Sequence, residues 1–497
     1  MNVTLTHSGL RRRSLRLVRI AGCILVLALM VGVALLHHFW PFTEAAVRSN
    51  LSEAFSANVR FGSFHHKYFP PGCIAENIVF QRDEDGAPLA EIRRLTITSG
   101  PGGLLRHQVS LFRAEGMHVT VATKGLGQNQ LRKQTTIDKF VADDAVLEIP
   151  RKGLQPSLRF VFHSFRLNDL NRPGITKFAA VFANPLPAGI IRTSGQFGPW
   201  NSSDPSATAV SGNYSLENAD LVVFHSIAGL VSSKGDFSGT FKQLAVEGHT
   251  QTPKFVVAKT GHGVPLDTHF RATVNAIKGD VTLNQVAAHF GKDSVTAKGT
   301  IARRDDGKRS VILDLTCDHG RIEDTFYRFI RSPKSPLAGD VAFRMHVVLP
   351  SGHEPFMKKL QLDSNFQIQN ARFTSPKVET RVSLVSSPPN RDETGTLADF
   401  QGSVTLNNGI AQFANLSVHD DGAAALLSGN YDLTDQKVNL HGKLKTEASL
   451  AKTTHGIKAV FAKAIEPLFK KKRHETVVPV HVGGTYSHPN FGLDLGS

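Results

Sequence analysis

Beyond the first 56 residues, apolar and polar side chains alternate one by one in many short runs along the chain. Leu95 and Ile97 alternate with Thr96 and Thr98, and residues 438–445 follow the same rule. Successive side chains of a β-strand point to opposite faces, so each run predicts a strand with one dry face and one wet face.

Tight-turn dipeptides separate the runs. Asp85-Gly86, Asp306-Gly307, Asn408-Gly409 and Asp421-Gly422 are typical of short hairpin turns. Three stretches also share a twenty-residue offset, at residues 219–239, 279–299 and 409–429, and each ends in Gly followed by Thr or Asn. This offset predicts repeated hairpins stacked along an axis, the alternative being chance recurrence of a common pattern. The expected fold is mainly β: an antiparallel sheet of repeated hairpins with a few short helices.

Four segments have helical spacing instead. Residues 42–56 place Val47, Leu51 and Phe55 on one helix face. Shorter helices are expected at 321–331 and 376–384, and an amphipathic helix at 449–469. The basic residues that follow this last helix are Lys470, Lys471, Lys472 and Arg473. They suit a membrane surface with anionic headgroups, or equally the solvated, dipole-stabilised end of a packed capping helix.

The N-terminus predicts a membrane anchor. A cluster of arginines (Arg11, Arg12, Arg13, Arg16 and Arg19) precedes 21 residues, 20–40, without a charged side chain. That length is close to the roughly 20 residues needed to cross a bilayer. The arginines place the N-terminus in the cytoplasm and the bulk of the chain outside it, in the periplasm of a bacterium. A cleaved signal peptide is the alternative, but residues 32–34 make a poor cleavage site.

These features divide the chain into five regions. They are a cytoplasmic basic N-terminus (1–19), a transmembrane helix (20–40), an N-terminal β region (41–210), a central β-repeat region (211–385) and a C-terminal β region with its helix (386–497).

The charge and the aromatic content of the chain limit the classes of partner that it is expected to bind. The 57 Lys and Arg exceed the 42 Asp and Glu by 57 − 42 = 15 positive charges. Lysines and arginines on outer strand faces account for this charge, and an anionic membrane is a better partner than nucleic acid for a chain outside the cytoplasm. The 32 Phe against 5 Tyr and 2 Trp favour apolar surfaces in a core or against lipid.

Signatures of catalysis are missing from the sequence. The chain has no His-Glu-x-x-His, Cys-x-x-Cys or Gly-x-Ser-x-Gly motif. The adjacent pair His65-His66 points to opposite faces of a strand, and a Cys73–Cys317 disulfide is possible but not required. We therefore expect no enzyme activity, no cofactor, no metal site and no catalytic residue, although a cluster of perturbed carboxylates or histidines in a cleft would revive the enzyme hypothesis.

If a sheet of such strands curls into an open trough, the apolar side chains of its strands line a groove. The residues expected to line this lipid groove are Val281, Leu283, Val404, Leu406, Leu440, Val478 and Val480. A closed sandwich or barrel core explains the same alternation.

Several short segments, taken in their order along the chain, also resemble a known family. They are residues 61–64, 87–92 and 116–121 near the start, and residues 320–324, 332–336, 371–378, 456–458, 467–472, 478–480 and 488–495 towards the end. In this order they resemble the AsmA-like family of bacterial envelope proteins. The resemblance implies an inner-membrane anchor and a periplasmic, elongated β-groove. It also implies a role in outer-membrane homeostasis by phospholipid transfer between membranes, with phospholipids and the inner membrane as partners. The alternative is a non-enzymatic assembly or scaffold factor for outer-membrane proteins, with envelope proteins as partners.

Overall fold

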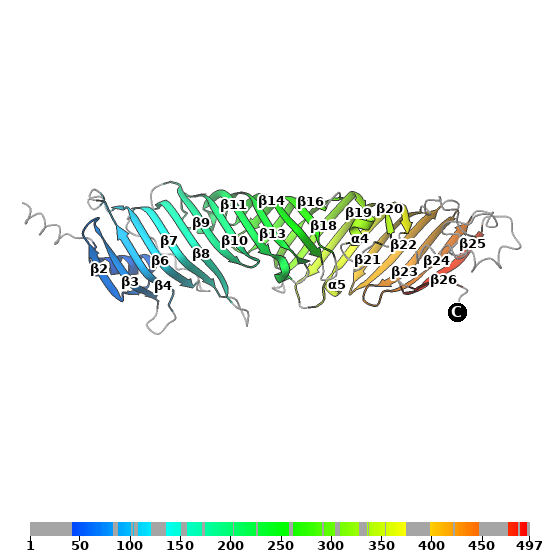
Figure 1. Cartoon of the computed structure of the whole chain (residues 1–497), viewed down its shortest axis with the longest axis horizontal. Coiled ribbons are helices and arrows are strands. Elements are labelled where there is room, and N and C mark those ends of the chain that lie inside the picture. The colour runs from blue at the N-terminus through cyan, green and yellow to red at the C-terminus, as the bar shows by residue number, and fades with distance from the viewer. Residues whose placement is uncertain are drawn as a thin grey trace, which may run out of the picture. The chain divides into compact units, whose positions relative to one another are not determined.

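The computed structural model describes most of the chain beyond residue 41 and is built almost entirely of β-strands (Figure 1). The described residues are 42–82, 88–100, 103, 108–120, 136–150, 157–170, 174–201, 203–224, 227–257, 262–290, 293–303, 309–327, 335, 337–352, 354–373, 398–420, 423–446, 476–485 and 488–494. The mainly β, largely antiparallel fold predicted from the alternation is confirmed. Within the described residues, no helix has the length and apolar character to span a bilayer.

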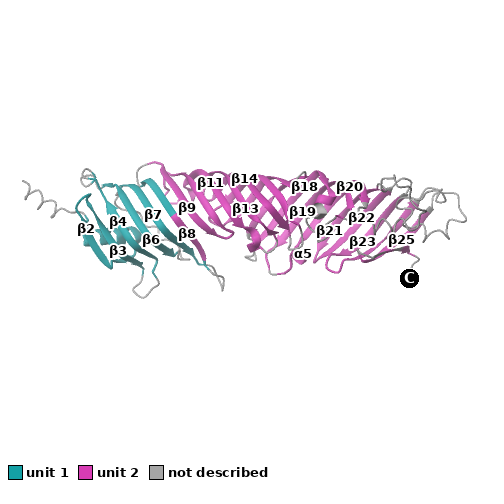
Figure 2. Cartoon of the chain, in the orientation of Figure 1, with its two compact units in different colours: residues 1–157, 164–172 teal, residues 158–163, 173–497 magenta. Residues whose placement is uncertain are grey.

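Several predicted segments lie outside the described residues. These are the arginine cluster and the 20–40 segment, the helices at 376–384 and 449–469, and the basic residues 470–473. The chain forms two compact units, residues 1–157 with 164–172 and residues 158–163 with 173–497 (Figure 2). We call them unit 1 and unit 2. The predicted boundary between residues 210 and 211 falls inside a strand of unit 2.

Unit 1 is a small sheet covered by one helix. Its elements are α2 (Glu44–Phe55), β1 (Asn58–Arg60), β2 (Ser63–Lys67), β3 (Gly72–Gln81), β4 (Ala90–Thr98), β5 (Gln108–Val109), β6 (Leu111–Thr120) and β7 (Thr136–Ile149). β1 and β2 both pair with β3, followed by β4 and β6, all antiparallel. β6 and β7 run parallel, which the hairpin pattern did not predict, and their Phe112 and Phe140 rings stack at 5.5 Å.

The helix α2 closes the core of unit 1. The Thr43 side chain caps it by accepting a hydrogen bond from the Ala46 amide at 3.3 Å. Val47 and Leu51 are buried against the sheet, where Ile78 and Leu95 are fully enclosed. Phe55 was predicted on the same face but is 60% exposed, because the helix ends there; its ring lies edge-on to Phe80, with centroids 5.1 Å apart.

Unit 2 is a long sheet in which strands follow one another in chain order. β8 (Leu158–Leu170) is divided between the two units. The other elements are β9 (Thr176–Pro185), β10 (Ala188–Phe197), η1 (Pro205–Ala207), β11 (Ala209–Asp220), η2 (Leu221–Phe224), β12 (Ile227–Ala228), β13 (Leu230–Thr240), β14 (Gln243–Val257), β15 (Val264–Asn275), β16 (Asp280–Phe290), β17 (Asp293–Arg303), β18 (Arg309–Arg321), α4 (Ile322–Tyr327), β19 (Leu337–Pro350), α5 (Phe356–Lys359), β20 (Gln361–Phe373), β21 (Ala398–Asn407), β22 (Ile410–Asp420), β23 (Ala423–Asp432), β24 (Lys437–Thr446), β25 (Thr476–Thr485) and β26 (His488–Leu493). From β9 to β26 the pairing is antiparallel, and the short β12 pairs with β14.

One of the four predicted tight turns lies within the described residues, whereas Asp85-Gly86, Asp306-Gly307 and Asp421-Gly422 lie outside them. Asn408 and Gly409 have φ of 49° and 79° and join β21 to β22 as a two-residue turn. Of the three offset stretches, two share one design. Gly279 and Gly409 each precede a strand, and Gly299 and Gly429 lie in the next strand beside a bulge. The first stretch differs, since residue 219 lies inside β11.

One further expectation needs correction. The sheet is long and uncurled, whereas a curled groove was expected. Alternation fixes which residues share a face, but curvature depends on local twist and bulges that the alternation does not specify. A helix is present within the segment 321–331, as α4 with Ile322 buried, and residues 328–331 lie outside the described residues. Cys73 and Cys317 are buried thiols, so they do not form a disulfide.

Candidate functional site: an apolar band on one face of unit 2

Strand register places all seven predicted groove residues on one face of unit 2. Residues paired across antiparallel strands share a face. One row runs Phe178, Gly195, Gly212, Phe237, Val246, Ala272, Leu283, Gly299, Leu313, Val347, Leu362, Leu406, Ala411, Tyr431 and Val438. A second row runs Ala180, Thr193, Tyr214, Gly235, Gly248, Phe270, Val286, Ala297, Leu315, Met345, Ser364, Val404, Phe413, Gly429, Leu440 and Val482. Val281, Val478 and Val480 lie two or four residues away on the same strands, so they share this face. We call the two rows the apolar band.

The apolar band contains no charged residue, while the opposite face of the same strands is strongly polar. Thr282, Thr405 and Asn439 are immediate neighbours of band residues and point the other way. Ion pairs lie on that polar face, such as Arg271 with Glu247 at 3.3 Å. The strands of unit 2 therefore carry the uncharged apolar band on one face and these ion pairs on the other.

Burial divides the predicted residues into two groups. Leu440, Val478 and Val480 belong to a closed cluster with Leu444 near the end of the sheet, and Leu406 is also buried. Val281, Leu283 and Val404 are only partly buried.

The open part of the band begins at β9. In strands β9 to β18 the buried apolar residues are mostly small, namely Ala180, Val210, Ala219, Ala272, Ala288 and Cys317. The large side chains of these strands, such as Phe237, Phe270 and Leu313, keep partly exposed surface. No described helix covers them in the way that α2 covers unit 1. These strands therefore present an apolar surface that the fold itself leaves open.

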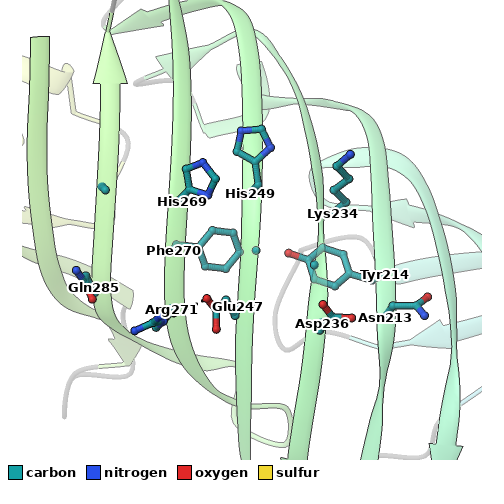
Figure 3. Close-up of a pocket in the computed structure, with 13 residues that line it drawn as sticks. Asn213, Tyr214, Lys234, Asp236, Glu247, His249, His269, Phe270, Arg271 and Gln285 are labelled. Carbon is teal, nitrogen blue, oxygen red and sulfur yellow. Dashed lines mark ion pairs between the residues drawn. The ribbon is translucent and has the colours of Figure 1, made fainter.

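Paired glycines shape this surface. Both rows contain the order aromatic, Gly, Gly, aromatic across four neighbouring strands. A side chain at Gly248 would lie 2.6 Å from the Tyr214 hydroxyl and 2.9 Å from the tip of Phe270. The two rings therefore occupy the space above the glycines, as Figure 3 shows by their approach from either side. An open hollow of about 600 Å³ reaches these rings and glycines, but most of its lining belongs to the opposite, polar face, including Lys234, Glu247 and His249.

The hydroxyl of Tyr214 does not bring a charge to the band. Burial raises the pKa of Tyr214, against a smaller opposing effect of its hydrogen bond with Ser233 at 3.1 Å. The phenol therefore stays neutral at physiological pH and has a partner within the sheet.

The polar face carries a group that sequence reasoning missed. His249 on β14 and Asp267 and His269 on β15 offer ligand atoms within 4.8 Å of one another. The signal was present in the sequence, because His249, His269 and His289 recur at the same twenty-residue offset as the hairpins.

Comparison with known proteins adds no assignment: the chain matches no family model, no curated protein and no solved structure.

Proposed function

We propose that this protein is a non-enzymatic lipid carrier whose apolar band holds phospholipid acyl chains. The observation that supports the proposal is the uncharged band, made mostly of apolar side chains and glycines, whose large side chains in strands β9 to β18 remain partly exposed. A contiguous, exposed apolar surface is typical of a site that binds a partner protein or a lipid.

The energetics suit acyl chains. Burying apolar surface yields about 0.8 kcal/mol per CH₂ when burial is complete. An acyl chain of about 16 carbons lying on an open face buries roughly half of its surface, which gives on the order of 6 kcal/mol per chain. Positions along the band are chemically alike, so a bound chain slides with little change in free energy.

The proposed setting follows from the N-terminal segment and the resemblance to AsmA-like proteins. Residues 20–40 anchor the chain in the bacterial inner membrane, and the β units lie in the periplasm. There the apolar band moves phospholipids between membranes and so maintains the outer membrane.

The test is phospholipid binding by the purified full chain. Detergent-purified protein is incubated with a fluorescent phospholipid and separated from free lipid. We expect lipid to remain with the protein at a stoichiometry of at least one. A folded protein that retains no lipid but purifies with a stable envelope protein would overturn the proposal in favour of an assembly factor.

A further inference from the structure

We propose that His249, Asp267 and His269 bind a divalent transition-metal ion on the polar face of unit 2, with His289 as the fourth ligand. His249 and His269 lie directly opposite one another on β14 and β15. Their rings stack with centroids 4.5 Å apart and planes inclined by 24°. Asp267 is two residues before His269 and therefore points to the same side of the sheet.

The spacing of the donor atoms fits one ion. Asp267 Oδ1 lies 2.6 Å from His249 Nε2 and 4.0 Å from His269 Nε2. Zinc binds imidazole nitrogen and carboxylate oxygen at about 2.0–2.2 Å, which sets ligand atoms of a tetrahedral site about 3.3 Å apart. Small side-chain rotations bring the observed separations to that value. Figure 3 shows the His249 and His269 rings side by side at the surface of the sheet.

The three donor groups favour one class of metal ion. Two imidazoles and a carboxylate suit Zn²⁺ and neighbouring transition metals better than Mg²⁺ or Ca²⁺, which prefer oxygen ligands. His249 directs Nε2 at the carboxylate, so this nitrogen already faces the place where the ion would bind.

His289 supplies the fourth ligand from a third strand. It lies on β16 directly opposite Asp267, and it is exposed. Directly opposed side chains have Cβ atoms about 5 Å apart, within reach of an ion held by Asp267. An ion bound in this way joins β14, β15 and β16.

The charges around the group are mixed. Burial raises the pKa of Asp267, but hydrogen bonds from His249 and Gln251 outweigh it and hold the pKa below its ordinary value, so the carboxylate is charged. Arg271 is paired with Glu247 at 3.3 Å. Lys234 on β13 lies directly opposite His249, and its positive charge repels a bound cation. Removing its charge should tighten binding by about two- to fivefold after screening by solvent and salt.

The site is independent of the proposed lipid function, because it lies on the opposite face of the sheet. The experiment uses the full chain in detergent, with any histidine tag removed, and measures Zn²⁺ affinity by competition with a chromophoric chelator. We expect one site that loses at least tenfold in affinity in the His249→Ala/His269→Ala variant. We expect weaker binding also in Asp267→Asn and tighter binding in Lys234→Gln.

A second histidine pair provides the matched control. His441 and His481 are also directly opposed, with rings 4.7 Å apart. Both ring nitrogens of His441 already have partners, Asp494 and Asn439, each at 2.9 Å. The His441→Ala/His481→Ala variant should therefore bind Zn²⁺ at the first site as the natural protein does.

Two results would overturn the metal site. One is equal Zn²⁺ affinity in the natural protein and the His249→Ala/His269→Ala variant. The other is an equal loss in the control pair, which would indicate non-specific binding to histidines. If the double variant does not fold, His269→Ala alone decides the matter, because the His269 side chain is 68% exposed and its removal leaves the sheet intact.

Discussion

A single charge on the open part of the apolar band should strongly reduce lipid binding. Leu283 is the best position, because it lies in the middle of one row, between Ala272 and Gly299, and is only partly buried. The Leu283→Glu substitution places a carboxylate where an acyl chain is proposed to lie. Its neighbour Thr282 is exposed on the polar face, so Thr282→Glu adds the same charge to the same strand on the other side.

The expected magnitude comes from two contributions. A leucine side chain that is fully buried contributes about 1.5–3 kcal/mol, and contact with a lipid on one side contributes about half of that. A carboxylate left under an acyl chain without a hydrogen bond costs about 1–3 kcal/mol more. Since the glutamate can bend toward water on an open face, we take the lower end, about 2 kcal/mol, which is roughly a 30-fold loss of affinity.

The assay is titration of the full chain with a fluorescent phospholipid, with circular dichroism to confirm that each variant is folded. Leu283→Glu should bind about 30-fold more weakly, and Thr282→Glu should bind as the natural protein does. Equal affinity of all three folded proteins would refute the assignment of lipid to this face.

Three further predictions concern stability. Leu444 is fully buried at the end of the sheet, so Leu444→Ala should lower the free energy of unfolding in urea by about 2–5 kcal/mol. Leu426→Ala, at a position that is 56% exposed, should change it little, and similar effects of the two would contradict the packing described. Gly409 has φ of 79°, so Gly409→Ala should cost about 1–2 kcal/mol, whereas Gly409→Asn should be tolerated better; the reverse order would exclude the turn geometry. Burial raises the pKa of Cys73 to about 12 from 9.0, so the folded protein favours the neutral thiol. This contribution to stability is present below pH 9 and is lost as the pH rises toward 12. The free energy of unfolding in urea should therefore fall less with pH over that range in Cys73→Ala than in the natural protein. An equal fall in both proteins would disprove it.

Much of the fold could be predicted from the residue pattern because a strand has a period of two. The alternation around Leu283 and Leu440 identified the strands and their shared apolar face, and the Asn408-Gly409 pair identified a hairpin. The parallel pairing of β6 and β7 was not predictable, because the turn signals describe only local connections. The uncurled form of the sheet was missed for a related reason, since residue types along one strand do not specify the twist between many strands.

The candidate sites also depend on how strands align with one another, which the pattern along a single strand does not specify. Register decides which parts of the apolar face are closed, so Val478 and Val480 could not be told apart from Val281 before the cluster around Leu444 was known. The group of His249, Asp267 and His269 depends on two strands being aligned to the residue. A shift of one position would send one imidazole to the apolar face, and the twenty-residue spacing alone does not fix that alignment.

The central claim is that acyl chains lie on the apolar band, and photo-crosslinking in living cells tests it most directly. A photoreactive phenylalanine analogue replaces band residues Leu283, Val286 and Val404 one at a time in the full chain. Matched positions are the polar-face neighbours Thr282, Gln285 and Thr405. We expect phospholipid attached to the protein after irradiation at the first three positions and none at the last three. Crosslinks to protein at the band, or equal lipid labelling on both faces, would contradict it.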